Sequence, residues 1–141
     1  MFSYTDQSFG FARLATAVPK MRVGDCTYNA QCIIELMERA QDENVSVLVF
    51  PELCITGYTA ADLFQQLALH RGALEALDSI VAASKGFSGL CLVGMPVAVD
   101  AQLFNTAIAI HKGEILGVVP KTSIPNYKEF YEGRWFSGAP E

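Results

Sequence analysis

The feature that most constrains the fold is a short apolar run that ends at a proline and is followed at once by an acid. Residues 45–50 read Val-Ser-Val-Leu-Val-Phe, and Pro51 and Glu52 come next. A run of β-branched and apolar residues this short is typical of a strand buried on both faces, as in a parallel sheet. Because Pro51 has no N–H to donate to a neighbouring strand, the strand is expected to end there. The pattern places Glu52 at the carboxyl end of a central strand, where open α/β sheets bind their ligands.

The same arrangement recurs later in the chain with a base in place of the acid. Residues 115–120 read Ile-Leu-Gly-Val-Val-Pro, and Lys121 follows. An acid and a base at equivalent strand ends suggest a shared site, in which Glu52 acts as a general base and Lys121 orients it and stabilises an oxyanion. The alternative for each residue is an ordinary solvated surface charge. Neither group is a strong nucleophile for acyl transfer, so such a site still needs a thiol or a hydroxyl.

The remaining periodicity predicts a mixed α/β sheet with the order β-α-β-α-β-β-β. Strands are expected over residues 11–18, 45–50, 90–95, 106–110 and 114–119. Pro19 ends the first strand, and Pro96 marks either the end of the third or an edge position. The short connection His111-Lys112-Gly113 predicts a hairpin between the last two strands.

Two helices are expected between the first three strands. Asp25 or Thr27 can cap the first helix, and Gly86 and Gly89 bracket the end of the second. The apolar faces at helical spacing consist of Ile33, Leu36, Met37 and Ala40 in the first helix and Leu74, Leu77, Ile80 and Val81 in the second.

Composition excludes several classes of function. The chain of 141 residues is long enough for one domain with a real core, and 51% of its residues are hydrophobic. A net charge of -5 without a Lys/Arg cluster argues against nucleic-acid binding. No apolar stretch approaches the ~20 residues that a membrane-spanning helix needs, and the N-terminus lacks the features of a signal peptide. These observations predict a soluble, cytoplasmic domain.

The cysteines and histidines show no pairing that indicates a metal site or a nucleophile. Cys26, Cys32, Cys54 and Cys91 are not at metal-ligand or CxxC spacing, so reduced thiols and no metal are expected. Cys54 is near Glu52, but side chains two apart on an extended segment point the same way without facing each other, so we expect it to pack beside the site. His70 and His111 are expected to have surface or packing roles.

The last part of the chain is rich in aromatic residues. They are Tyr127, Phe130, Tyr131, Trp135 and Phe136, interleaved with charged residues that include Glu132. One interpretation is a loop that covers the core with its aromatic rings. The other is a pocket wall for a small polar substrate, in which Glu132 binds an ammonium or supports Lys121.

Two segments resemble motifs of a known superfamily. Residues 51–58, Pro-Glu-Leu-Cys-Ile-Thr-Gly-Tyr, resemble the glutamate motif of the nitrilase (carbon–nitrogen hydrolase) superfamily. Lys121 and residues 124–132, Ile-Pro-Asn-Tyr-Lys-Glu-Phe-Tyr-Glu, resemble its lysine motif. The Tyr-x-Glu-Phe-Tyr-Glu form is similar to the N-terminal glutaminase domain of bacterial glutamine-dependent NAD synthetases. The resemblance implies a nitrilase-like α-β-β-α sandwich, of which residues 1–141 form only the N-terminal part.

The resemblance also implies a Glu-Lys-Cys triad that hydrolyses glutamine. Glu52 and Lys121 match its first two members, while the nucleophile would follow a strand beyond Lys121, where this chain has no cysteine. The chain is therefore expected to be an inactive fragment of the enzyme. Tyr58, Tyr127, Phe130 and Glu132 are the implied substrate-binding residues.

For the complete enzyme, the resemblance implies that the ammonia released from glutamine passes to a synthetase domain. That domain would use ATP and magnesium to convert deamido-NAD to NAD, in an enzyme that forms a homo-oligomer. Two alternatives remain: a stand-alone amidase of the same superfamily, and a non-catalytic interaction module.

Overall fold

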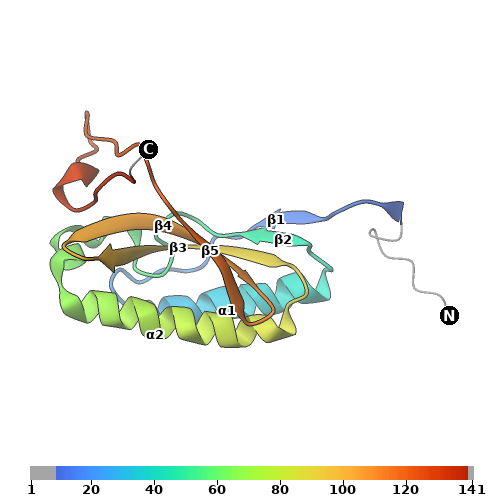
Figure 1. Cartoon of the computed structure of the whole chain (residues 1–141). Helices are drawn as coiled ribbons and strands as arrows, with labels where there is room; N and C mark the ends of the chain where they lie inside the picture. Colours follow the sequence, from blue (N-terminus) through green and yellow to red (C-terminus); the bar gives the residue numbers. More distant parts are fainter. Residues whose placement is uncertain (1–8, 140–141) are drawn as a thin grey trace.

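The computed structural model describes residues 9–139, which form one mixed five-stranded sheet with two helices on one of its faces (Figure 1). The strands lie in sequence order, with β1, β2 and β3 parallel and β3, β4 and β5 antiparallel. The elements are β1 (Leu14–Thr16), α1 (Cys26–Asp42), β2 (Val47–Val49), α2 (Leu67–Ala83), β3 (Leu90–Val99), β4 (Gln102–His111) and β5 (Glu114–Pro120), with short 3-10 turns η2 (Tyr58–Gln65), η3 (Ser84–Gly86) and η4 (Glu132–Arg134). The predicted order of strands and helices is confirmed.

The helices pack against each other and cover the core side of the sheet. Asp25 is the N-cap of α1, and its carboxylate accepts the N–H of Tyr28 at 3.1 Å. The predicted apolar face of α1 is correct. In α2 the prediction for Leu74 is wrong, because the buried side is made by Leu69, Ala73, Ala76, Leu77 and Ile80, and Leu74 lies on the flank with 53% of its surface exposed. Within residues 9–139, no helix is both long and apolar enough to cross a membrane.

All five strands differ in length from their predictions: β2 is shorter than residues 45–50, β4 begins at Gln102 rather than at residue 106, and β5 is one residue longer than predicted. Strand β1 is shorter than residues 11–18, because it is an edge strand that pairs only with the three residues of β2. Strand β3 continues through Pro96 to Val99, so the proline does not end it. Pro96 lies beyond Leu92, where pairing with β2 stops, and the missing N–H is tolerated in a strand that has lost one neighbour.

The expectation that residues 45–50 are buried on both faces is wrong. Leu48 faces the helices and is 1% exposed, whereas Val49 is 36% exposed. The helices lie on one face only, and no element of residues 9–139 covers the other (Figure 1). Val119 in β5 lies on the same uncovered face as Val49 and is 64% exposed, so the uncovered surface is apolar.

The predicted hairpin is confirmed, and it fixes where β5 ends. Lys112 and Gly113 have positive φ angles of 47° and 86°, as a two-residue type I′ turn requires, and His111 pairs with Glu114 across it. A bulge at Ala109/Ile110 shifts the register of the two strands. Strand β5 then ends with Pro120 opposite Thr106, in the middle of β4.

Candidate active site

Glu52 lies in a tight turn that follows β2. The chain reverses because the N–H of Cys54 donates to the carbonyl of Pro51 at 3.3 Å and the N–H of Gly57 donates to that of Leu53 at 2.8 Å. Leu53 has a φ of 52°, an uncommon conformation for a residue with a side chain. Its side chain is fully buried, and this burial holds the turn in place while Glu52 points outward.

The turn is braced against β3 at Gly94. A Cβ atom there would collide with the backbone of Leu53, so only glycine permits this close approach. The Cys54 thiol accepts the N–H of Gly94 at 3.3 Å and lies 3.7 Å from its carbonyl oxygen. Burial raises the pKa of the Cys54 thiol to about 11, which keeps it protonated. Cys54 therefore packs beside the site, as predicted.

Lys121 follows the last residue of β5, which is the edge strand farthest from β1, and its side chain extends to Glu52. Its backbone N–H donates to the carbonyl of Asn105 at 2.8 Å, which extends the pairing of β4 and β5. Its Nζ atom lies 2.8 Å from Oε1 of Glu52. The structure therefore brings together the acid and the base that the two strand ends predicted.

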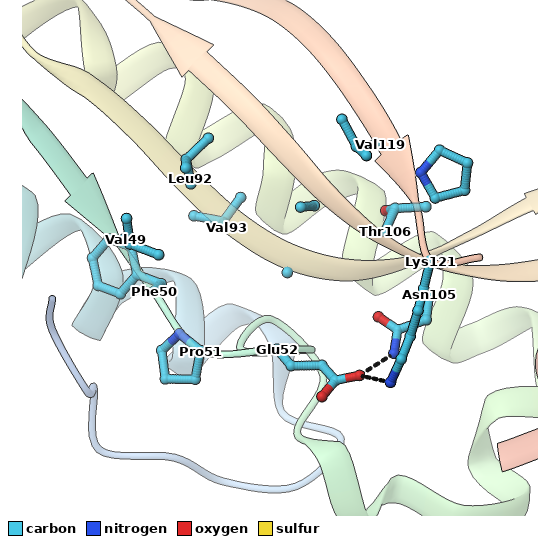
Figure 2. Close-up of a pocket in the computed structure, with 13 residues that line it drawn as sticks. Val49, Phe50, Pro51, Glu52, Leu92, Val93, Asn105, Thr106, Val119 and Lys121 are labelled. Atoms are coloured by element: carbon cyan, nitrogen blue, oxygen red, sulfur yellow. Dashed lines mark hydrogen bonds and ion pairs between the residues drawn. The ribbon is translucent and has the colours of Figure 1, made fainter. Parts of the chain in front are cut away.

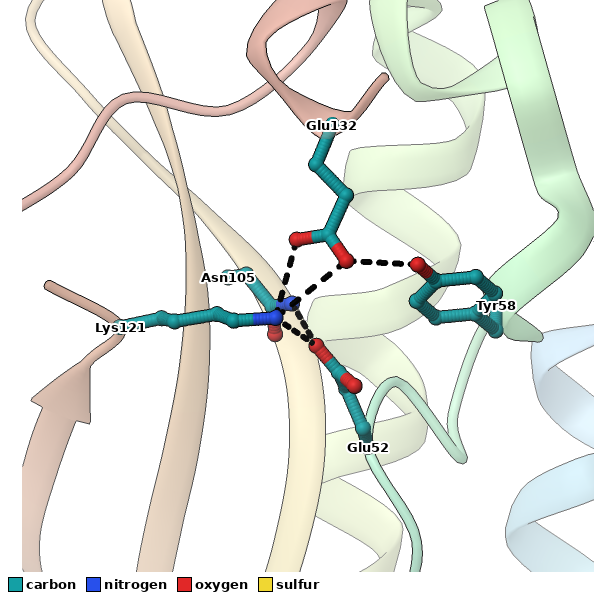
Figure 3. A network of polar contacts seen from close by, with 5 residues as sticks. All are labelled: Glu52, Tyr58, Asn105, Lys121 and Glu132. Atoms are coloured by element: carbon teal, nitrogen blue, oxygen red, sulfur yellow. Dashed lines mark hydrogen bonds and ion pairs between the residues drawn. The ribbon is translucent and has the colours of Figure 1, made fainter. Parts of the chain in front are cut away.

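Three further residues complete a polar network around this pair (Figure 3). Nζ of Lys121 donates to Oε2 and Oε1 of Glu132 at 3.0 and 3.3 Å. The Tyr58 hydroxyl donates to Oε1 of Glu132 at 2.6 Å, and the side-chain amide of Asn105 donates to Oε1 of Glu52. The network joins residues from the turn after β2, from η2, from β4 and from the segment after β5.

The network sets the protonation of two of its members. Partial burial of Lys121 alone would lower its pKa, but hydrogen bonds and charge attraction from Glu52 and Glu132 together hold the pKa above its usual value. Lys121 is thus a fixed cation at neutral pH. Desolvation, and then the hydrogen bond to Glu132, raise the pKa of Tyr58, so its hydroxyl remains a donor.

The pair lies at the junction of two pockets. One pocket of about 430 Å³ runs over the uncovered face of the sheet, between apolar side chains such as Val49, Leu92 and Val119 (Figure 2). The second, of about 530 Å³, is lined by Pro51, Glu52, Tyr58, Lys121, Pro125, Tyr127, Phe130 and Glu132. The second pocket contains every site residue that the sequence predicted.

The aromatic segment divides between the two interpretations given above. Phe136 is buried, and its ring and that of Trp135 pack against Phe64 with centroids 4.9 and 5.8 Å apart. These two residues cover the core. Tyr127 is 64% exposed and lies beside Phe130 on the wall of the second pocket.

The other cysteines and the histidines lie away from the site. Burial raises the pKa of Cys26, and it raises that of Cys91 to about 12. A ring nitrogen of His70 lies 2.6 Å from the carbonyl oxygen of Phe64, and one of His111 lies 3.0 Å from that of Gly89. Their packing roles agree with the prediction.

The sequence interpretation missed Asn105. It is 3% exposed and lies in β4, within a strand that carries no catalytic motif. The available signal was the hairpin, because counting back from its two-residue turn places Asn105 within one residue of the position opposite Lys121.

The fold and the paired acid and base define the class of protein. The model of the carbon–nitrogen hydrolase family matches residues 13–137, so the chain belongs to this family. Among curated relatives, the chain is 37% identical over 131 residues to a glutamine-dependent NAD(+) synthetase of Mycobacterium leprae, covering 93% of this chain and 19% of the relative. A glutamine-dependent NAD(+) synthetase of Xylella fastidiosa is 34% identical over 131 residues, with 92% and 24% covered. The chain thus spans about a fifth of the length of these relatives.

Solved structures show the same arrangement of elements. A glutamine-dependent NAD(+) synthetase from Cytophaga hutchinsonii superposes with a TM-score of 0.85 at 29% identity, covering 92% of this chain and 22% of that one. An amidase of the nitrilase superfamily from Nesterenkonia AN1 gives a TM-score of 0.79 at 20% identity, with 92% and 49% covered. The amidase supports the nitrilase-like fold alone.

Proposed function

We propose that this chain is the N-terminal part of the glutaminase domain of a glutamine-dependent NAD synthetase. The observation that carries the proposal is the contact of 2.8 Å between Lys121 and Glu52 in an open pocket. The relative from Mycobacterium leprae and the solved structure from Cytophaga hutchinsonii are both named as such synthetases. In this function the pocket binds glutamine, and the ammonia it releases is used to make NAD from deamido-NAD.

Glu52 serves as the general base in this proposal. It takes the proton of a cysteine thiol, and the thiolate attacks the side-chain amide of glutamine. Ammonia leaves, and water activated by Glu52 then hydrolyses the thioester. The exposed position of Glu52, at 43% of its side-chain surface, supports this role because the reacting groups must reach it.

Lys121 stabilises the oxyanion of the tetrahedral intermediate together with a backbone amide. An ammonium group has three N–H donors, and the two short contacts to Glu52 and Glu132 use two of them. The third makes the longest contact, 3.3 Å to Oε1 of Glu132, and in this proposal the substrate oxygen replaces it. Because Glu132 is only 3% exposed and already accepts from Lys121 and Tyr58, its geometry favours support of Lys121 over binding of a substrate ammonium.

The pocket wall supplies the substrate contacts. Tyr58, Tyr127 and Phe130 surround the opening beside Glu52, and a flat amide fits between aromatic rings and a few polar groups. Tyr58 is oriented by Glu132, whereas Tyr127 is largely exposed and free to contact the substrate from outside.

In this proposal the nucleophilic thiol comes from a residue outside 1–141. The four cysteines are Cys26, Cys32, Cys54 and Cys91, and none of them lines either pocket beside Glu52. We therefore expect the 141-residue chain alone to release no ammonia from glutamine. Measurable turnover that disappears in Cys54→Ala would place the nucleophile at Cys54 and contradict this assignment.

The remaining requirements belong to the complete enzyme. ATP and magnesium would serve a synthetase domain rather than this pocket, and the assembly would be a cytoplasmic homo-oligomer. These points rest on the family resemblance of residues 51–58 and 124–132 alone.

The proposal is tested by measuring ammonia release and NAD formation by the complete gene product with L-glutamine, L-asparagine and propionamide as nitrogen donors. We expect glutamine to support both readouts and to be preferred over the other two amides. Hydrolysis of propionamide with no NAD formation from glutamine would indicate a stand-alone amidase. No hydrolysis of any amide would indicate a non-catalytic module.

A further inference from the structure

The carboxylate of Glu52 is held by one of its two oxygens. Oε1 accepts from Nζ of Lys121 and from the side-chain amide of Asn105 (Figures 2 and 3). Within the part of the chain that the structure describes, no donor reaches Oε2. A carboxylate with two donors on one oxygen has one anchored atom and one atom with its lone pairs available for a proton.

Asn105 is the more rigid of the two donors. Its side chain is short and 3% exposed, and its backbone carbonyl is fixed by the N–H of Lys121 at 2.8 Å. Lys121, in contrast, has a flexible four-carbon side chain whose ammonium is shared between Glu52 and Glu132. Orientation of Glu52 therefore depends on Asn105 more than on Lys121.

The chemistry of the two groups also fixes the orientation of the amide. An ionised carboxylate can only accept hydrogen bonds, so the NH₂ group of Asn105 must face Glu52 and its oxygen must point away. An N–H donor favours the ionised form of the carboxylate, which is the form a general base needs.

We propose that Asn105 is a positioning residue that anchors Glu52 through Oε1 and leaves Oε2 as the oxygen that takes up the proton. This inference rests on the proposed function. The S–H bond of the incoming thiol breaks, its proton moves to Oε2 and the C–S bond forms at the amide carbon. The proton then passes to the departing nitrogen as the C–N bond breaks, and Oε2 is free again to take a proton from water.

The test uses two substitutions in the complete gene product. Asn105→Ala removes the donor, and Asn105→Asp keeps the shape but presents an acceptor to Oε1, which also preserves the test if the alanine variant fails to fold. We expect kcat to fall by on the order of 10²-fold in both, with KM changed only a few-fold, because the base is misplaced rather than the substrate. Unchanged kcat in a folded variant would overturn the proposal.

The pH profile separates positioning from a structural effect. Loss of the donor makes Glu52 easier to protonate, so the acid limb of kcat/KM should move to higher pH by about one unit in Asn105→Ala and further in Asn105→Asp. The matched control is Ser84→Ala, which removes a buried side chain that hydrogen-bonds to Val81 and Gly113 at the other end of the sheet. The Ser84→Ala substitution should lower the melting temperature and leave the acid limb of the kcat/KM profile at the same pH as in the wild type.

A second readout does not require turnover. When the ¹³C-labelled Glu52 carboxyl is titrated and followed by NMR, the midpoint of the titration should rise from wild type to Asn105→Ala and again to Asn105→Asp. An unmoved midpoint would overturn the anchoring by Asn105 even if glutamine is hydrolysed. If the midpoint moves but the wild type releases no ammonia from glutamine, the anchoring is supported and the proposed function is what fails.

Discussion

Two ion-pair clusters hold the segment that follows β5, and they differ in how completely their groups are paired. The Lys121 cluster consists of Glu52, Lys121 and Glu132. The Arg134 cluster consists of Asp62, Arg134 and Trp135. In it, Asp62 accepts two hydrogen bonds from Arg134 at 2.8 and 2.9 Å and one from the Trp135 indole at 2.9 Å.

The difference separates a structural contact from a reactive one. Both oxygens of Asp62 are occupied, its pKa is held well below its usual range by the Arg134 and Trp135 hydrogen bonds, and the pair is exposed at 60% and 57%. In the Lys121 cluster, one oxygen of Glu52 has no donor from residues 9–139, and the pair lines a pocket. A saturated pair can only tie two segments together, whereas an unsaturated pair beside a pocket can also exchange a proton.

The largest contrast is expected when the cation of each cluster is removed in the complete gene product. Lys121→Ala should lower kcat and kcat/KM together by roughly 10²- to 10³-fold, because Lys121 acts on charge that develops in the transition state. Arg134→Ala should change kcat by less than about 2-fold, since exposed pairs contribute little. Steady-state kinetics with glutamine decide the matter. A raised KM with unchanged kcat in Lys121→Ala would make Lys121 a binding residue.

A smaller effect is expected from the acid that supports Lys121. Glu132→Gln keeps the size of the side chain but removes the charge that holds the ammonium in place. Loss of a hydrogen bond to a charged group predicts a fall in kcat of roughly 10-fold or somewhat more. The matched control is Glu129→Gln, an acid of the same segment that is exposed and lies outside the pocket lining. Equal kinetics for the two variants would remove Glu132 from the site.

The pocket wall should affect binding more than turnover. Tyr127→Phe removes a hydroxyl that no residue in 9–139 holds, so KM should rise a few-fold with kcat nearly unchanged. Tyr131→Phe is the control, because the Tyr131 ring packs on Trp135 with centroids 5.3 Å apart and does not line the pocket. A change in kcat but not in KM for Tyr127→Phe would indicate a role in the chemical step.

The smallest effect is expected in the Arg134 cluster, and it concerns stability. Asp62→Asn should leave the kinetics unchanged and lower the melting temperature slightly. Because the pKa of Asp62 is lower in the folded chain, its contribution is present above the unfolded value of about 4 and is lost as the pH falls further. Thermal melts of wild type and variant should thus differ at neutral pH and converge in acid. A difference that persists at low pH would show that packing, not charge, is responsible.

The sequence predicted the two central residues because a proline marks both strand ends. Pro51 and Pro120 signal that an apolar run has stopped, and the next residue in each case is at the site. It could place Asn105 opposite Lys121 only to within one residue, because the bulge at Ala109/Ile110 shifts the register between β4 and β5. It could not predict the hydrogen bond between Tyr58 and Glu132, since these residues are 74 positions apart and meet only through the fold.

The errors in the fold have the same origin. An apolar run predicts a strand, but whether each face is covered depends on elements elsewhere, and Val49 is exposed because both helices lie on the opposite face. Leu74 is apolar at helical spacing, yet the small Ala73 and Ala76 form the contact side of α2. Local patterns specified the elements, and tertiary packing decided which side chains are buried.

The most direct test of the central claim compares two nitrogen donors in Glu52→Gln of the complete gene product. The substitution keeps the shape of the side chain and removes the base, and general-base catalysis typically contributes about 10²- to 10⁴-fold. We predict that glutamine-dependent NAD formation falls by about this factor while NAD formation from added ammonia stays within about 2-fold of the wild type. Equal loss with both donors would contradict the account, because Glu52 would then not serve a glutaminase site.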